Sequence, residues 1–329
     1  MDTRQLIIDT AERIFGDHVD KAVRDRAEDG ALPTTLWRVL DANGLTAIGA
    51  LGSESSLDDA YAVLRSAGRC AVPGPLAETL IANRLWSEAG GSAAPGATTV
   101  AIVTGGDSAV DVPWAKASGR VLCIRREGDR AWLAMVESAR LDVRPGANMA
   151  GEARDDFSLR ELAPTFITAK RGFDEIEALL ALSRAVMMAG CLETVLRFAV
   201  TYALARKQFG KPISGFQAIQ HQLAVLAGET AAAVRAANGA VEQLDTERFV
   251  LDVAAAKSRV GEAAGRGAEI AHQVHGAIGF THEHELHQFT RRLWAWREEY
   301  GNEAVWQTRL GRVVAARGAD AAWAFVASF

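Results

Sequence analysis

The spacing of apolar residues changes character twice along this chain of 329 residues, and no other feature constrains the fold as much. Residues 1–95 carry apolar side chains at helical spacing, interrupted by Gly and Pro. From residue 97, short runs rich in β-branched residues alternate with Gly and Asp turns. After Pro164 the helical spacing returns and persists. This order predicts an α+β protein that is mostly α, with an N-terminal helical domain at 1–95, a middle antiparallel β domain at 96–165 and a C-terminal helical bundle domain at 166–329.

The middle part is expected to form a compact group of strands, at 98–103, 120–125, 130–136 and 141–144, followed by a loop from Pro145 to Asp156. Two long helical segments are expected after it, from about Phe173 to Gly210 and from Phe216 to Leu244. The second is rich in alanine with spaced Leu and Val, a composition that suits close packing between helices.

Charge and cysteine content exclude several classes of protein. A formal charge of −5 and a pI near 5.9 disfavour a nucleic-acid-binding surface, which needs clustered Lys and Arg. Three widely separated cysteines without a CxxC pair predict neither a disulfide framework nor a thiolate metal site.

Residues 1–13 mix charged and apolar side chains, unlike a signal peptide, and no uncharged apolar run reaches about 18 residues. We expect a cytoplasmic protein that binds neither nucleic acid nor membrane.

The first stretch with chemical content runs from Tyr202 to Gln217 and reads YALARKQFGKPISGFQ. A Gly followed two residues later by Pro predicts that one long helix ends here and another begins. Many such turns only connect two helices and have no chemical role. Within one helical turn, however, Arg206 offers a planar guanidinium able to grip a diphosphate, Gln208 a polar amide and Phe209 a flat apolar ring.

The second stretch runs from Ala271 to Leu286 and reads AHQVHGAIGFTHEHEL. Gly276 and Gly279 break the helical pattern and allow backbone amides to approach an anion. A GxxG pair by itself is weak evidence, because glycine turns are common and most of them bind nothing.

Together, in this order and at this separation, the two stretches resemble the C-terminal domain of the acyl-CoA dehydrogenase family, whose members carry an RxxFG turn and later a QxxGGxG turn. The helical, β, helical order matches that family's three-domain plan, which ends in a four-helix bundle. The resemblance implies flavin adenine dinucleotide (FAD) as cofactor, because in the family these turns reach the ADP part of a neighbouring subunit's FAD. Carried over residue by residue, it implies cofactor contacts for Arg206, Gln208, Phe209, Gln217, Gln273 and Gly276. Ala277 stands where the family usually has its second glycine.

The catalytic base departs from the family pattern. Family members remove the α proton of an acyl-CoA with a carboxylate. One family position for it, just before Gly301, is Tyr300 here, and the other is Leu180, beside Ala181. Glu299 is the one candidate catalytic residue, although a shift of one residue turns a helical side chain by about 100°. The alternative, a solvated Glu298–Glu299 pair, is the simpler interpretation.

The middle domain also departs from the family. Residues 104–108 only faintly match the loop that cradles the flavin ring, whereas residues 112–115, VPWA, resemble the shorter subunits of bacterial heterotetrameric acyl-CoA dehydrogenases that act on steroid or other bulky CoA thioesters. The resemblance therefore implies the short subunit of an α2β2 heterotetramer, which completes the FAD site of a longer subunit. It also implies an acyl-CoA substrate and an electron-transfer flavoprotein as acceptor. Two alternatives stay open, a self-sufficient homotetramer with Glu299 as base and a flavin-free scaffold or CoA-thioester-binding subunit.

Six of the seven histidines lie between His221 and His287. They include a single ExxH, at Glu269–His272, whereas a di-iron bundle needs two such motifs. No metal site is expected, and polar contacts at helix turns explain these residues more simply. The tryptophans Trp294, Trp296 and Trp306 are expected in the core.

Overall fold

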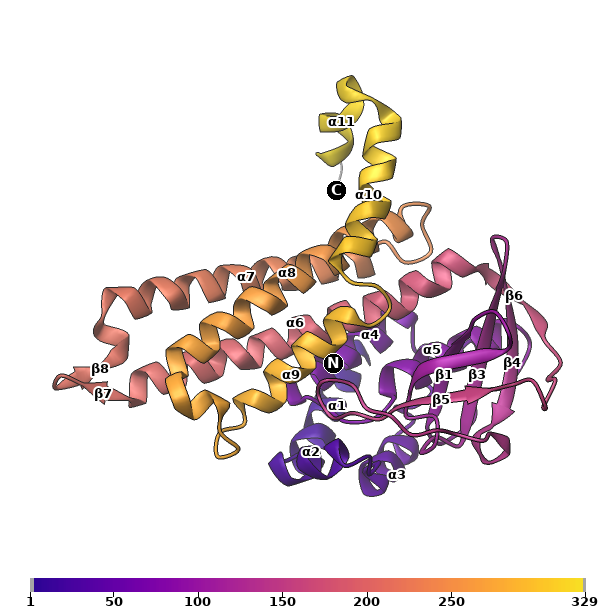
Figure 1. Ribbon diagram of the computed structural model, residues 1–329, viewed down its shortest axis with the longest axis horizontal. Coiled ribbons are helices and arrows are strands. Elements are labelled where there is room, and N and C mark those ends of the chain that lie inside the picture. Colours follow the sequence, from indigo (N-terminus) through magenta and orange to yellow (C-terminus); the bar gives the residue numbers. More distant parts are fainter. Residues whose placement is uncertain (1–2, 328–329) are drawn as a thin grey trace. The chain divides into compact units, whose positions relative to one another are not determined.

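The protein is described by a computed structural model that covers residues 3–327 and separates into two compact units, residues 1–180 and residues 181–329. Figure 1 traces the order of the elements. The first unit contains the N-terminal helices and the strands, and the second contains the C-terminal helices. The chain is mostly helical with a small sheet, as the apolar spacing predicts.

Five helices open the first unit. They are α1 (Thr3–His18), α2 (Lys21–Glu28), α3 (Thr34–Ala42), α4 (Leu57–Cys70) and α5 (Leu76–Glu88). A capping box starts α4, because the Ser56 hydroxyl accepts from the Asp59 amide at 3.1 Å and the Asp59 carboxylate accepts from the Ser56 amide at 2.8 Å. The buried face of α4 includes Tyr61, whose hydroxyl donates to the Leu179 carbonyl at 2.9 Å.

Six strands follow and form two sheets. They are β1 (Thr98–Val103), β2 (Ser108–Pro113), β3 (Arg120–Glu127), β4 (Arg130–Glu137), β5 (Arg154–Ser158) and β6 (Ile167–Gly172), with a 3₁₀ turn η1 (Ser138–Arg140) after β4. The larger sheet has the order β1-β3-β4-β6, and β2 pairs with β5 in the smaller one. The predicted strands at 98–103, 120–125 and 130–136 are confirmed.

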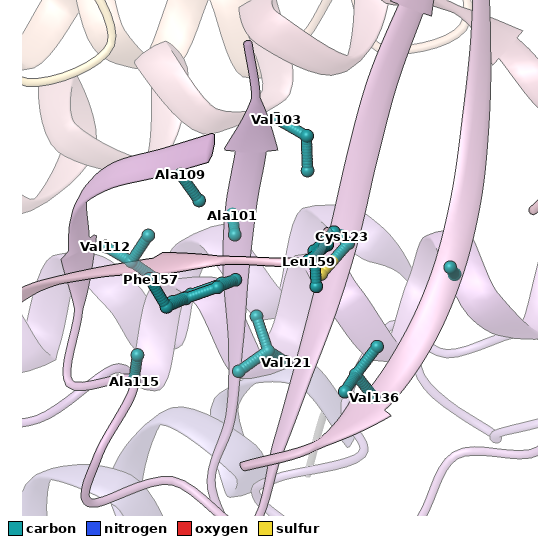
Figure 2. Packing of buried hydrophobic residues seen from close by; sticks show 11 residues of the cluster. Ala101, Val103, Ala109, Val112, Ala115, Val121, Cys123, Val136, Phe157 and Leu159 are labelled. Carbon is teal, nitrogen blue, oxygen red and sulfur yellow. The ribbon is translucent and has the colours of Figure 1, made fainter. Parts of the chain in front are cut away.

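Apolar side chains from both sheets share one core, drawn in Figure 2. Val121, Cys123 and Val136 come from the larger sheet, and Val112 and Phe157 come from the smaller one. All five are at most 5% exposed. Because successive strand residues point to opposite faces, alternate positions such as Val121 and Cys123 reach the same core.

Three details of the predicted β part are wrong. The pairs β3–β4, β4–β6 and β2–β5 are antiparallel as expected, but β1 runs parallel to β3. The cause is β2, which turns back antiparallel after β1 at the Thr104–Ser108 bridge and lies near β1, so that β3 begins at the same end as β1. Residues 141–144 form no strand, since only Arg144 makes an isolated bridge, to Asp156. The end of the predicted loop, residues 154–156, instead begins β5.

The boundaries of the three predicted domains stay a prediction. Two observations bear on them. Strand β6, at 167–172, pairs with β4, so the sheet continues past residue 165. The N-terminal helices and the sheet also belong to one compact unit.

Helix α6 (Phe173–Ala205) begins in the first unit and continues into the second. It is followed by β7 (Lys207–Gln208), β8 (Lys211–Pro212), η2 (Ile213–Gly215), α7 (Gln217–Val241), α8 (Phe249–His275), η3 (Gly276–Phe280), α9 (Leu286–Glu298), α10 (Glu303–Arg317) and α11 (Ala319–Val326). Helices α6 to α9 form the expected four-helix bundle, in which α7 and α8 run side by side (Figure 1). Among the tryptophans, Trp296 and Trp306 are fully buried, as expected.

Among residues 3–327, α6 is the one helix long and apolar enough to cross a membrane by composition. Of its most apolar window, 89% is buried inside the protein. That is the pattern of a core helix, whose apolar length reflects contact with protein on all sides.

Candidate functional site

The first stretch forms a tight hairpin between α6 and α7. The Arg206 amide donates to the Tyr202 carbonyl at 2.8 Å, and the Arg206 carbonyl accepts from the Ile213 amide at 2.8 Å. Between these bonds β7 and β8 pair, and the tip residues Phe209 and Gly210 have φ values of 51° and 81°. Two successive left-handed residues are the signature of a type I′ turn. The predicted helix therefore ends at Ala205, before Gly210, because the tip cannot continue a right-handed helix.

Phe209 stands on the hairpin tip with 92% of its surface exposed. Its ring meets the Phe216 ring edge-on at 6.1 Å between centroids, and the Lys211 ammonium lies 4.4 Å from the Phe216 centroid. Arg206, Gln208 and Gln217 are exposed around these rings. The hairpin thus offers apolar rings beside cationic and amide groups on one open surface, a combination suited to a charged ligand with a flat ring.

The second stretch ends α8 at His275 and turns sharply at Gly276. Gly276 has φ 63° and ψ −146°, close to a backbone region that only glycine adopts readily. A Cβ built on Gly276 would meet nothing within 4 Å, whereas one built on Gly279 would lie 3.0 Å from the His275 Cβ. Gly276 and Gln273 are exposed. Gly276 therefore lies at an open surface, whereas Gly279 allows close packing against His275.

The fold brings the two stretches together. The Tyr202 ring, at the end of α6, stacks on the His275 ring, at the end of α8, with centroids 4.7 Å apart and planes 25° apart. Ile213 from the hairpin and Val274 from α8 belong to the same apolar cluster. All six predicted cofactor-contacting residues are exposed. The two turns are therefore parts of one end of the bundle, and their polar groups face outward.

Buried histidines support this end of the bundle. The His275 Nδ1 atom lies 2.7 Å from the Ala271 carbonyl, and burial lowers the pKa of His275 to about 4. His272 Nε2 lies 2.8 Å from the Thr290 hydroxyl, and burial also lowers the pKa of His272. Both rings are therefore neutral at pH 7. Among residues 3–327 no cluster of His, Cys, Asp and Glu side chains is arranged to hold a metal ion.

A hollow of about 340 Å³ lies between α7 and α8, beside Gln273. Its lining residues are His221, Gln222, Val225, Arg266, Glu269, Ile270 and Gln273. The Gln222 Oε1 atom is buried and accepts no hydrogen bond within the described part of the chain. A buried acceptor without a donor is costly, and this favours a ligand or water in the hollow. Arg266, Glu269 and Gln273 lie at helical spacing along one face of α8. This polar spacing is the one sign of the hollow in the sequence, and none of the sequence-based predictions uses it.

The structure changes the interpretation of Glu299. Its carboxylate accepts from Arg184 Nε at 2.6 Å, and the two side chains are 16% and 3% exposed. Glu298, in contrast, is exposed and accepts from the Asn302 side chain at 2.9 Å. The expected solvated pair is thus wrong for Glu299, because α9 ends at Glu298 and the extended backbone of Glu299 turns its side chain toward α6.

The other family positions for a base carry no carboxylate. Leu180 and Ala181 are fully buried within α6. Tyr300 has a φ of 55°, and its ring centroid lies 5.2 Å from the Arg184 guanidinium. In the first unit, residues 104–108 form a turn closed by the Thr104 amide and the Ser108 carbonyl at 2.9 Å, with Asp107 paired to Arg125.

Residues 170–315, which contain both turns, match the family model of the acyl-CoA dehydrogenase C-terminal domain. The chain is also 33% identical, over 279 residues, to the acyl-CoA dehydrogenase FadE34 of Mycobacterium tuberculosis. Residues 170–315 belong to the acyl-CoA dehydrogenase family. The chain is 29% identical to the acyl-CoA dehydrogenase IpdE2 of M. tuberculosis over 320 residues. The FadE34 match covers 79% of this chain but 38% of FadE34, and the IpdE2 match covers 88% and 90% of the respective chains.

Three solved structures illustrate that the fold is shared with other proteins. The ChsE4–ChsE5 complex from M. tuberculosis contains a chain with a TM-score of 0.83 and 20% identity, covering 96% of this chain and 98% of its own length. The Tcur3481–Tcur3483 steroid ACAD variant gives a TM-score of 0.75 and 22% identity, with coverage of 95% and 98%. PigA with FAD and proline gives a TM-score of 0.78 and 16% identity, with coverage of 97% and 99%. At these identities the likeness establishes the fold alone.

Proposed function

We propose that this chain is a subunit of a flavin-dependent acyl-CoA dehydrogenase and that it completes the FAD site of a longer partner subunit. Its hairpin and its glycine turn would hold the ADP part of a neighbour's FAD. The observation that carries the proposal is the stacking of Tyr202 on His275, which joins the two turns into one exposed surface.

The residues at this surface fit such a cofactor. Arg206 is exposed and able to make a bidentate contact with a phosphate. Gly276 leaves the backbone open to close approach, since even a Cβ there would meet no neighbour within 4 Å. The exposed Phe209 ring suits contact with a flat group or with another subunit. The hollow beside Gln273 adds a buried amide oxygen, on Gln222, as an acceptor for a donor on the ligand.

The same residues favour a division of labour between two chains. Bound FAD would supply the two-electron acceptor for α,β-dehydrogenation of an acyl-CoA thioester. The required carboxylate base would come from the partner, because Tyr300 and Leu180 stand at the family positions and Glu299 is engaged by Arg184. The similar solved structures, the ChsE4–ChsE5 complex and the Tcur3481–Tcur3483 steroid ACAD, support a heterotetramer and a bulky acyl group such as a steroid. An electron-transfer flavoprotein is the proposed acceptor, and the cytoplasm the proposed location.

The visible spectrum tests this proposal. The chain purified alone is expected to be colourless, and the chain co-purified with a longer acyl-CoA dehydrogenase subunit is expected to be yellow and active. Yellow, active protein from this chain alone would instead support the self-sufficient enzyme with Glu299 as base. Colourless protein in both preparations would support the flavin-free scaffold.

A substitution at Arg206 makes the test specific to the hairpin. Arg206→Ala is expected to weaken FAD binding in the complex by at least about tenfold, because a bidentate charged contact contributes more than about 1.4 kcal/mol. The control is Arg235→Ala, which removes an arginine from the exposed surface of α7, where it pairs with Glu242 at 2.8 Å. The measurement is flavin absorbance per complex after gel filtration. Equal flavin content in both variants would contradict the role of Arg206.

A further inference from the structure

A buried cation lies beneath the corner between α9 and α10. Lys257, on α8, is fully buried. Its ammonium group donates to the carbonyls of Arg297 at 2.7 Å and Gly301 at 2.9 Å, and it lies 3.4 Å from the carbonyl of Trp296. Trp296 and Arg297 are in the last turn of α9, and Gly301 lies just before α10. One side chain therefore satisfies helix-end carbonyls and ties them to the loop that follows.

The corner that Lys257 contacts has an unusual backbone. Tyr300 and Gly301 are both left-handed, with φ values of 55° and 91°. Such a conformation is unfavourable at a non-glycine residue and persists only where neighbouring groups impose it. The Tyr300 carbonyl accepts from Trp306 Nε1 at 3.0 Å, and Arg184 holds the Glu299 carboxylate at 2.6 Å. Carbonyls and side chains of the corner are thus held from α6, α8 and α10.

Acidic groups compensate the buried ammonium. Glu303, which pairs with Arg297 at 2.7 Å, fits against α8 only because residue 261 is glycine, since a Cβ there would lie 1.7 Å from the Glu303 Oε1 atom. Residue 261 is one helical turn from Lys257. Burial lowers the pKa of Lys257 to about 8, while Glu303, Glu299 and Glu298 act to raise it and Arg184 acts to lower it. Lys257 therefore belongs to a charge cluster in which each helix of the corner takes part.

We propose that Lys257 anchors the α9–α10 corner: its ammonium group holds the carbonyls of α9 and of Gly301 together and so keeps Glu299 on Arg184. The corner occupies the place where other family members carry the base. In this chain it is built as a fixed structural joint. The inference does not require flavin to bind, and its test is made on the chain without ligand.

Hydrogen exchange measured by mass spectrometry tests the proposal. In Lys257→Met, the amides of residues 297–303 are expected to exchange about tenfold faster, which corresponds to the loss of one ordinary hydrogen bond. Exchange in α7 is expected to stay unchanged. The control is Arg266→Met, which removes a largely exposed cation from the same helix and is expected to leave the corner unchanged. Unchanged exchange at 297–303 in Lys257→Met, or an equal increase throughout the second unit, would overturn the proposal.

A second variant perturbs the corner from its other side. In Gly301→Ala the new Cβ would lie 2.8 Å from Trp306 Nε1 on a backbone that disfavours side chains. We expect the amides of residues 297–303 to exchange faster in this variant than in the wild type. In the double variant Lys257→Met/Gly301→Ala, they are expected to exchange no faster than in whichever single variant exchanges faster. Independent, multiplying effects would contradict a shared corner. If Lys257→Met does not fold, exchange at residues 297–303 in Gly301→Ala that is as slow as in the wild type would itself overturn the proposal.

The pH dependence of stability gives an independent readout. Between pH 8 and 10.5 the unfolded chain holds a proton on Lys257 that the folded chain has lost, so stability rises with pH in this window. The folding equilibrium constant of the wild type is expected to gain on the order of a hundredfold relative to Lys257→Met. A flat difference between the two proteins would show that Lys257 is not the buried cation of the corner.

Discussion

Glu299 illustrates how one side chain changes meaning between sequence and structure. Its place beside Tyr300 made it the candidate base, yet its carboxylate is held by Arg184 and is 16% exposed. A carboxylate that abstracts a substrate proton needs to be within reach of that proton. In the structure Glu299 makes a partly buried ion pair between α6 and the end of α9, and we propose that this pair is a structural contact.

Glu299→Gln tests this assignment. The change keeps the shape of the side chain but removes the negative partner of a buried guanidinium, so we expect a loss of about 2 kcal/mol in the free energy of unfolding. Turnover of the complex is expected to fall by less than about tenfold, whereas loss of a general base costs about a hundredfold or more. Glu298→Gln, at the exposed neighbour, serves as the control. Unchanged stability with abolished turnover would restore Glu299 as the base.

His275 provides a pH-dependent prediction. Its pKa is about 4 in the folded protein, because burial disfavours the charged ring, against an ordinary value of 6.5. As pH falls from 6.5 to 4 the unfolded chain takes up a proton that the folded chain refuses, so stability is lost in this window. The expected loss is about 3 kcal/mol by pH 4.

Chemical denaturation of the wild type and of His275→Gln at pH 7 and pH 4.5 measures this effect. The variant is expected to lose less stability on acidification, although it starts lower because the Tyr202 stack is removed. His221→Gln, at an exposed position on α7, controls for the general effect of acid. Identical pH dependence in all three proteins would contradict the burial of a neutral His275.

At the scale of helices, the long apolar segments are what the sequence predicts best. The segment predicted at 216–244 corresponds to α7, at 217–241, because a helix of this length repeats its apolar spacing many times. Strands β7 and β8 have two residues each, which is too short for an alternating apolar pattern to predict them. The parallel pair β1–β3 was also invisible, since strand direction depends on the path of the connection through β2.

Close packing of α8 against α6 and α7 depends on Gly267. A Cβ at this position would lie 2.7 Å from Leu192 Cδ2 on α6 and 3.2 Å from Leu226 Cδ1 on α7. Gly267→Ala is therefore expected to lower the free energy of unfolding by about 1–3 kcal/mol through overpacking. Gly228→Ala on α7, where nothing lies within 4 Å, is expected to raise it by about 1 kcal/mol through helix propensity. Denaturant titration of both variants measures the contrast, and equal signs would contradict this packing.

At the scale of the whole molecule, the proposed division of labour between two chains rests on where the candidate site residues lie. The polar groups of the two turns face outward, the family base positions hold Tyr300 and Leu180, and residues 104–108 form a closed turn. This distribution supports the proposal that the chain completes a site on a second polypeptide. Its match to FadE34, which is longer, and to IpdE2, which is of similar length, is consistent with one fold used in chains of different extent.

The sequence alone determined the order of helical and β segments, the two motif stretches and the absence of a carboxylate at positions 180 and 300, because each depends on residue type and spacing within a short window. Tertiary structure alone decided that Tyr202 meets His275, that Glu299 pairs with Arg184 and that Lys257 lies under the corner. Each of these contacts joins residues on different helices. Their proximity depends on how side chains pack between helices, and apolar spacing within one helix carries no record of the partner it will face.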